Sequence, residues 1–152
     1  MNNLPYVLVD TCVLTKMGGE YRTTLDCLSI TEDIIAVTKE ILKEYEGRAY
    51  PSRLILQAFL QDLEGKGKLK HFNRSRIKAS LRRHENHRTI NYPSHPPDRK
   101  WIEVAIAISA KYIISINEHL LRIPPNRYDN ETLEVVDPSE YVVLRCPEIN
   151  TC

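Results

Sequence analysis

The sequence contains no apolar run that approaches the ~18 residues needed to cross a membrane. Its first residues, MNNLPYVL, carry neither the basic segment nor the longer apolar segment of a secretory signal. These absences predict a cytoplasmic protein without a membrane partner. At 152 residues, the chain is expected to form a single domain over residues 1–152, long enough to bury a substantial core.

Cysteines are few, and the common nucleotide-binding motifs are missing. The cysteines at 12, 27, 146 and 152 show no CxxC or Cys/His spacing, which argues against a zinc site. We expect reduced thiols, as is usual in the cytosol, and a bridge between Cys146 and Cys152 stays open because both lie near the end of the sequence. The chain has no P-loop and no GxGxxG, so nucleotide hydrolysis and dinucleotide binding have no support. Cys12 also stands where a phosphatase of the haloacid dehalogenase type needs its second aspartate.

The net charge of +1 conceals one strongly basic segment. Residues 66–88 contain nine Lys or Arg against one Glu, and the rest of the chain has a formal charge of −7. We expect this basic segment to be helical, with the helix running from about Arg74 to His87. A segment of this kind is either a solvated helix face or a binding region for a polyanion, and the sequence leaves both interpretations open.

Short apolar runs alternate with helix-like segments along the chain. Strands are expected at 6–9, 34–37, 112–115 and 133–136. Helices are expected at 14–29 with an interruption at Gly18 and Gly19, at 39–47 after a Thr38 cap, and at 51–65, 98–110, 118–122 and about 139–146. Within 51–65, the residues with the spacing of an apolar helix face are Leu54, Ile55, Ala58, Phe59 and Leu63. The alternation predicts an α/β fold with a mainly parallel central sheet between two layers of helices.

Asp10 is a carboxylate placed where a buried strand ends, in the stretch YVLVDTCVL. Burying an ionised carboxylate is costly unless it is paired, hydrogen-bonded or bound to a metal. The functional crevice of a parallel α/β sheet lies at the carboxyl ends of its strands. Asn117 follows the strand expected at 112–115, and Asp98 opens the helix that leads into it. We therefore expect Asp10, Asp98 and Asn117 to converge at one edge of the sheet.

Three blocks of the sequence, YVLVDTCVL, IIAVTKEILKEYEG and PPDRKWIEVAIAISAKYIISINEHLL, resemble in order and spacing the PIN domain, a compact metal-dependent nuclease fold. The closing LEVVDPSEY is similar to the last strand and turn of that family, so the likeness spans nearly the whole chain. The resemblance implies a PIN-like fold in which Asp10 and Asp98 are family acids, and in which Glu44 is the acid of the helix after the second strand.

The chain departs from the family pattern after the fourth strand. The family usually has a further aspartate there, where this sequence has Asn117, and His119 stands where a second acid often lies. Either one of the metal ligands is the neutral Asn117, or Glu118 replaces the missing acid. The sequence leaves this alternative open.

The resemblance implies that Asp10, Glu44 and Asp98 are catalytic and that, with Asn117, they hold Mg²⁺ or Mn²⁺. Hard divalent cations prefer oxygen ligands, activate water, and offset the charge that develops on a phosphate during hydrolysis. They also make clustered carboxylates mutually tolerable. Thr11 is expected to bond a phosphate or to orient Asp10.

Each acid also has an ordinary structural explanation. Asp98 can be a helix-start acid after two prolines, Glu44 a solvated helix residue, and Asn117 a turn residue. Asp10 is harder to explain in this way, because it needs a partner at the end of a buried strand.

Two functions of different classes follow. The leading one is a divalent-metal-dependent endoribonuclease that hydrolyses phosphodiester bonds in single-stranded or structured RNA, of the kind found as toxins of toxin–antitoxin pairs. The alternative is a catalytically degenerate PIN module that binds RNA or a protein partner without cleavage. An antitoxin or a second copy of the chain is an expected protein partner. The residues expected to contact RNA are Thr11, Arg74, Arg76, Lys78, Arg82 and Arg83, with Phe72 and Tyr92 as stacking candidates.

Overall fold

A computed structural model describes residues 5–49, 52–85, 90–128 and 131–149, and it places six strands in one sheet of order β3-β2-β1-β4-β6-β5. The strands are β1 (Tyr6–Val9), β2 (Ile34–Val37), β3 (Leu69–His71), β4 (Tyr112–Ile114), β5 (Asn126–Tyr128) and β6 (Glu131–Val136). All neighbours pair in parallel except β5 and β6, which are antiparallel. The predicted α/β fold with a mainly parallel sheet is confirmed.

The central strands coincide with the apolar runs of the sequence. Val7, Leu8 and Val9 of β1 are fully buried, as are Ile113 and Ile114 of β4, because helices cover both faces of a parallel sheet. The strands β3 and β5 were not predicted. They lie at the two edges of the sheet, where LKH and NRY are held by backbone pairing and need no apolar run.

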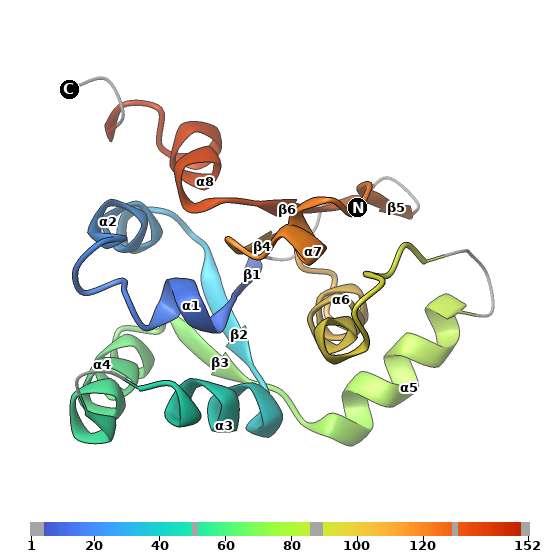
Figure 1. Cartoon of the computed structure of the whole chain (residues 1–152), viewed down its shortest axis with the longest axis horizontal. Helices are drawn as coiled ribbons and strands as arrows, with labels where there is room; N and C mark the ends of the chain where they lie inside the picture. Colours follow the sequence, from blue (N-terminus) through green and yellow to red (C-terminus); the bar gives the residue numbers. More distant parts are fainter. Residues whose placement is uncertain (1–4, 50–51, 86–89, 129–130, 150–152) are drawn as a thin grey trace.

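Helices lie on both sides of the sheet, an arrangement compatible with three layers. They are α1 (Thr11–Leu14), α2 (Arg22–Ile30), α3 (Lys39–Gly47), α4 (Arg53–Gly65), α5 (Arg74–Glu85), α6 (Arg99–Ala107), α7 (Glu118–Leu121) and α8 (Pro138–Arg145), with a 3-10 turn η1 (Pro96–Asp98) before α6. Figure 1 shows α5 and α6 on one side of the sheet and α2 and α8 on the other. Within the described ranges, no helix combines the length and apolarity required to span a bilayer.

Helix α3 begins and ends where the sequence predicted, since the Thr38 hydroxyl accepts a hydrogen bond from the Ile41 N–H at 3.2 Å. Within the basic segment 66–88, α5 begins at Arg74 as the sequence predicted, whereas the residues before it contain β3, which was not predicted. The end of the expected helix, at 86–87, lies outside the described residues.

The predicted apolar face of α4 is wrong in part: Ala58 is exposed together with Leu54 and Ile55, whereas Phe59 is half-buried and Leu63 is buried. Leu54 and Ile55 are 78% and 55% exposed, whereas Leu56, Leu60 and Leu63 are buried. The sequence LILQAFLQDL carries two overlapping apolar stripes with helical spacing, and packing selects the stripe that begins at Leu56. Helix α4 packs beside β3, at the edge of the sheet.

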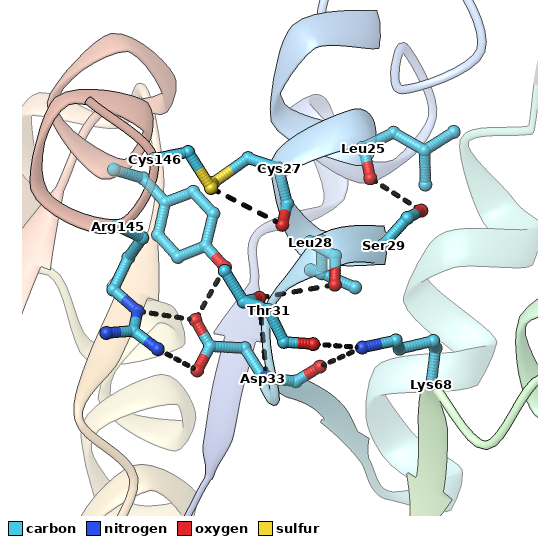
Figure 2. The surroundings of a disulfide bond; sticks show 10 residues. Leu25, Cys27, Leu28, Ser29, Thr31, Asp33, Lys68, Arg145 and Cys146 are labelled. Atoms are coloured by element: carbon cyan, nitrogen blue, oxygen red, sulfur yellow. Dashed lines mark hydrogen bonds and ion pairs between the residues drawn. A yellow bond between two sulfur atoms is a disulfide. The ribbon is translucent and has the colours of Figure 1, made fainter. Parts of the chain in front are cut away.

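A disulfide joins Cys27 of α2 to Cys146 at the end of α8, with the sulfur atoms 2.21 Å apart (Figure 2). The expectation of reduced thiols is therefore wrong for these two residues. Cys12 is a free, half-buried thiol. The bridge between Cys146 and Cys152 that the sequence left open is not formed, because Cys146 pairs with Cys27, and Cys152 itself lies outside the described residues. A cytoplasmic location stays a prediction, and disulfides are uncommon in that compartment.

The fully buried Asp33 lies beside this disulfide (Figure 2). Its carboxylate accepts hydrogen bonds from Arg145 at 2.9 and 3.1 Å and from the Tyr141 hydroxyl at 2.7 Å, and it pairs with Lys111 at 2.9 Å. Burial alone would raise the pKa of Asp33, but these partners outweigh it and hold the pKa below its ordinary value. The disulfide and this ion cluster together fasten α8 to the rest of the fold.

Candidate functional site

The order of the strands reverses between β1 and β4. From β1 the chain builds β2 and β3 outward on one side, and it then crosses to place β4 on the other side of β1. A crevice forms outside the carboxyl ends of the two strands at such a switch point, and ligands of open α/β sheets bind there. Asp10 directly follows β1 and Ser115 directly follows β4, and the Asp10 N–H bonds the Ile114 carbonyl at 2.9 Å.

Asp10 is 7% exposed, and both of its carboxylate oxygens are hydrogen-bonded. The Ser115 hydroxyl donates to Oδ2 at 2.7 Å, and the Thr11 N–H donates to Oδ1 at 2.8 Å. Burial raises the pKa of Asp10, these two bonds lower it in part, and the charges of Glu44 and Asp98 raise it further. Glu44 and Asp98 therefore both lie within electrostatic reach of Asp10.

Asp98 turns toward this crevice and makes no capping bond to its own helix. Its Oδ2 accepts a hydrogen bond from the Asn117 side-chain amide at 3.2 Å and lies 2.9 Å from His95 Nδ1. Asp98 stands at the start of α6, as the ordinary explanation of a helix-start acid held, and its carboxylate is also bound to Asn117 and His95.

Asn117 links the two aspartates. Its N–H donates to the Ser115 hydroxyl at 2.9 Å, that hydroxyl donates to Asp10, and its side-chain amide donates to Asp98. Its Oδ1 accepts from the His119 N–H at 2.9 Å and so caps α7. Asn117 is thus a turn residue, as the ordinary explanation held, and a bridge within the site as well.

Glu44 reaches the site from α3 and is paired with Lys100. Their side chains are 29% and 21% exposed, and Lys100 Nζ lies 2.9 Å from Glu44 Oε2. The adjacent Tyr45 is fully buried, and its hydroxyl donates to the Val9 carbonyl at the end of β1. This bond fixes α3 against the strand that carries Asp10, which places Glu44 beside the crevice rather than in solvent.

The Thr11 hydroxyl is an unusual feature of the site. Thr11 is 2% exposed, and its Oγ1 atom has no hydrogen-bond partner in the described part of the chain. An unpaired buried hydroxyl is destabilising, so a group that could accept or donate a bond at this position would be favoured. The contact of Thr11 with a phosphate stays a prediction, and its backbone N–H bonds Asp10, the other role that the sequence left open.

The ligand atoms at the site are of types that suit a divalent metal ion, but their present arrangement is not that of a metal site. Carboxylate, amide and hydroxyl oxygens are ligands that Mg²⁺ and Mn²⁺ accept. Across residues 5–49, 52–85, 90–128 and 131–149, however, no three His, Cys, Asp or Glu side chains are grouped so that they could hold a metal ion. The carboxylates of Asp10, Glu44 and Asp98 are each bound to neighbours of the chain, so a cation would have to displace some of these bonds.

The basic residues predicted to contact RNA divide into two groups. Arg74 and Lys78 line a groove between α3, α5 and α6, whereas Arg76, Arg82 and Arg83 are exposed and are not part of its lining. Of the stacking candidates, Phe72 lines the same groove, and its ring packs edge-on against Tyr6 with centroids 5.1 Å apart. The Arg99 guanidinium lies 4.1 Å from the ring centroid of Tyr92.

Sequence reasoning missed three residues of the site: Ser115, Lys100 and His95. Ser115 stands between β4 and Asn117, so its position at a strand end was the available signal. His95 lies one helical turn before Asp98, and its ring stacks on that of His119 with centroids 5.0 Å apart. Lys100 gave no signal, because the pairing partner that makes it notable lies on another helix.

Comparison of the chain with models of protein families, with curated proteins and with solved structures gave no match. The resemblance to the PIN domain therefore stays a prediction from the sequence. The geometry at the ends of β1 and β4 is the observation on which a function can be proposed.

Proposed function

We propose that this protein is a PIN-like, divalent-metal-dependent endoribonuclease whose site lies at the carboxyl ends of β1 and β4. The observation that carries the proposal is the hydrogen-bonded chain from Asp10 through Ser115 and Asn117 to Asp98. It connects two buried or half-buried acids at the switch point of the sheet, where ligands of this fold class bind.

Electrostatics support a role for this cluster beyond stability. Burial raises the pKa of Asp10, and the charges of Glu44 and Asp98 raise it further, which disfavours its ionised form in the folded protein. Acids that weaken the fold in this way are typical of functional sites. A divalent cation held by Asp10, Glu44 and Asp98 would relieve the repulsion, and when bound it would supply an activated water and offset negative charge on the phosphate.

The remaining residues of the site would hold and orient these groups. Ser115 and the Thr11 N–H orient the Asp10 carboxylate, and Asn117 and His95 orient Asp98. The unpaired Thr11 hydroxyl is buried, so it could bond a phosphate oxygen only if the side chains that cover it moved. Lys100 neutralises Glu44 in the present arrangement, and Glu44 can contact a cation only when that ion pair opens.

The Lys100–Glu44 pair also favours the second candidate, a module that binds RNA without cutting it. In that case Lys100 replaces the cation permanently, and Asn117 takes the place of an acid. We place the nuclease first because three acids remain at the site. The assignment to toxins of toxin–antitoxin pairs, and with it an antitoxin or homodimer partner, rests on the family resemblance alone.

The test is cleavage of a labelled single-stranded RNA by the purified protein with Mn²⁺ or Mg²⁺, and with EDTA. We expect cleavage that EDTA stops, and a loss of at least about 100-fold in rate for Asp10→Asn or Asp98→Asn. Asp26→Asn is the matched control, since Asp26 is an exposed acid of α2. Circular dichroism verifies that each variant is folded.

Cleavage that persists in EDTA, or equal rates for Asp10→Asn and the unmodified protein, would rule out the nuclease. Calorimetry with Mn²⁺ distinguishes the second candidate. Heat of binding that disappears in Asp10→Asn supports a metal-dependent site, and a folded protein that takes up no Mn²⁺ and cuts no RNA supports the non-cleaving module.

A further inference from the structure

Five cationic side chains surround a groove that adjoins the acidic site, which consists of Asp10, Glu44, Asp98 and the side chains bound to them. The groove has a volume of about 620 Å³ and is bounded by α3, α5 and α6. Its cationic residues are Lys39, Lys43, Arg74, Lys78 and Lys100. Two acids, Glu40 and Glu103, also line it, and Lys100 is paired with Glu44, which leaves a formal excess of two positive charges. An excess of this kind favours a polyanionic ligand.

The rest of the lining is largely apolar. Ile77, Leu81 and Val104 are buried, and the ring of Phe72 is half-buried beside them. A lining that combines cations with apolar and aromatic surface matches a nucleotide chain, in which charged phosphates alternate with flat bases. An acidic peptide or an inorganic phosphate would use only the cations.

Three helices begin at the groove. Lys39 is the first residue of α3, Arg74 the first of α5, and Lys100 the second of α6. Figure 1 shows the first turns of α3 and α5 close together. The N-terminal ends of helices carry partial positive charge, so the backbone adds to the field of the side chains.

The walls of the groove are held in place by bonds between elements. The Ser80 hydroxyl of α5 donates to the Ala107 carbonyl of α6 at 2.7 Å. The Phe72 N–H donates to the Val37 carbonyl at 2.8 Å, which fixes the start of α5 beside the start of α3. The groove is therefore largely formed before a ligand arrives.

The groove and the acidic site share one residue, Lys100. It lines the groove and pairs with Glu44, and Glu44 directly follows Lys43 on α3. A polynucleotide lying in the groove would therefore pass the acidic site at the end of the groove where Lys100 lies.

We propose that this groove binds a single-stranded polynucleotide, with phosphates held by Lys39, Lys43, Arg74 and Lys78 and bases packed on the apolar lining. Its identification as the binding path for substrate RNA rests on the proposed function. A groove of this size accommodates nucleotides of one strand, whereas duplex RNA is read across about 16 base pairs of open surface.

The test measures binding, not cleavage. A labelled oligouridylate of about a dozen residues, within the ~4–16-nucleotide range of single-strand sites, is titrated by fluorescence anisotropy with the full-length Asp10→Asn protein in EDTA. In that background, Lys43→Gln with Lys78→Gln should weaken binding about tenfold or more. The slope of log K against log salt should fall by about 1.4, because each phosphate contact contributes about 0.7.

The control pair is Lys16→Gln with Lys66→Gln, which removes the same charge from exposed positions outside the groove. It should change affinity less than about threefold. Equal losses for the two pairs would overturn the proposal, because binding would then follow net charge. Binding of an RNA duplex as tight as that of the single strand, or displacement of the RNA by polyglutamate at equal charge, would overturn it as well.

A second measurement avoids substitutions. Acetylation of lysines in the unmodified protein, read by mass spectrometry, should show that oligouridylate in EDTA protects Lys39, Lys43 and Lys78. It should leave Lys16 and Lys66, which lie in exposed ion pairs, unprotected. Protection of both sets alike, or of neither, would contradict the proposal. If an oligodeoxythymidylate binds as tightly as the oligouridylate, the groove recognises the phosphate backbone alone. If the oligouridylate binds more tightly, the groove prefers RNA.

The two proposals fail separately. If the groove binds RNA and the unmodified protein with Mn²⁺ does not cut, only the nuclease assignment is lost. If the protein cuts and the substitutions at Lys43 and Lys78 leave KM and salt dependence unchanged, only the groove is wrong.

Discussion

Asp10 is a buried carboxylate whose surroundings favour its protonated form. Burial is the main reason for its raised pKa, with Glu44 and Asp98 adding to it and Ser115 and Thr11 opposing it. The group is therefore tolerated in the fold rather than stabilising it. This is the expected trade-off at a functional site, where charge is positioned for a ligand at the expense of stability.

The substitution Asp10→Asn tests whether the charge of Asp10 lowers the stability of the fold. In the unfolded chain Asp10 ionises near its ordinary pKa, whereas the folded protein retains the proton to higher pH. The carboxylate therefore lowers the free energy of unfolding as pH rises from about 3.8 through its folded-state pKa. We expect Asp10→Asn to raise the melting temperature at neutral pH, by about 2–4 °C for each kcal/mol relieved.

The gain should shrink in acid, where both states of the unmodified protein are protonated, and melting temperatures across a pH series measure it. Asp26→Asn, at an exposed position, should show no such trend. A loss of stability in Asp10→Asn that is equal at neutral and acid pH would mean that its hydrogen bonds matter more than its charge.

At the scale of elements, α4 shows how packing selects among apolar stripes. Leu54 and Ile55 have the composition of core residues but are exposed, while Leu56, Leu60 and Leu63 face the sheet. Ser52 begins the helix by accepting a hydrogen bond from the Ile55 N–H at 3.2 Å. This cap determines where the helix starts, and the edge strand β3 determines which stripe is buried.

Two alanine substitutions test this orientation by urea denaturation. Leu56→Ala should lower the free energy of unfolding by about 2–5 kcal/mol, because it removes a buried side chain and leaves a cavity. Leu54→Ala removes the same atoms from an exposed site and should stay within about 0.5 kcal/mol. The reverse order would show that α4 is rotated about its axis, as the spacing of Leu54, Ile55 and Leu63 in the sequence suggests.

At the scale of the whole molecule, the fold is closed by a bond between segments remote in the sequence. Cys27 and Cys146 are 119 residues apart, so their disulfide restricts nearly the entire unfolded chain. The Asp33 cluster on the same side of the fold adds polar contacts from Arg145 and Tyr141. Both features lie on α8 and its neighbours, and no residue of the acidic site takes part in them.

Reduction of the disulfide should lower the free energy of unfolding by about 2–5 kcal/mol. The measurement is the urea midpoint with and without dithiothreitol, together with alkylation of the released thiols read by mass spectrometry. A protein with Cys27→Ser and Cys146→Ser should show the lower midpoint with or without reductant, whereas Cys12→Ser should behave like the unmodified protein. An unmodified protein whose midpoint ignores the reductant, although both thiols become alkylated, would contradict this role for the disulfide.

Local sequence was sufficient for the central strands and for the acids at their ends. Apolar runs such as YVLV predict buried strands, and the carboxyl ends of parallel strands meet at one edge of a sheet. The pattern of residues therefore places Asp10 at this edge, and it places Asp98 there because α6, which starts just after Asp98, runs back to the beginning of β4. The edge strands β3 and β5 escaped prediction, since short, exposed strands are defined by their neighbours' backbone groups.

By itself, the sequence determined the α/β class, the start of α3 at its Thr38 cap, and the position of Asp10 at the end of a buried strand. Only the tertiary structure decided what these residues meet. The Ser115 hydroxyl that holds Asp10 is 105 positions away in the chain, and the lysine that neutralises Glu44 comes from another helix. The disulfide and the cationic groove likewise join residues that are remote in the sequence, so the tertiary structure decided them too. Periodicity reports which residues can form a buried face, but packing selects among such faces, as in α4, and contacts between elements depend on how the whole sheet is wound.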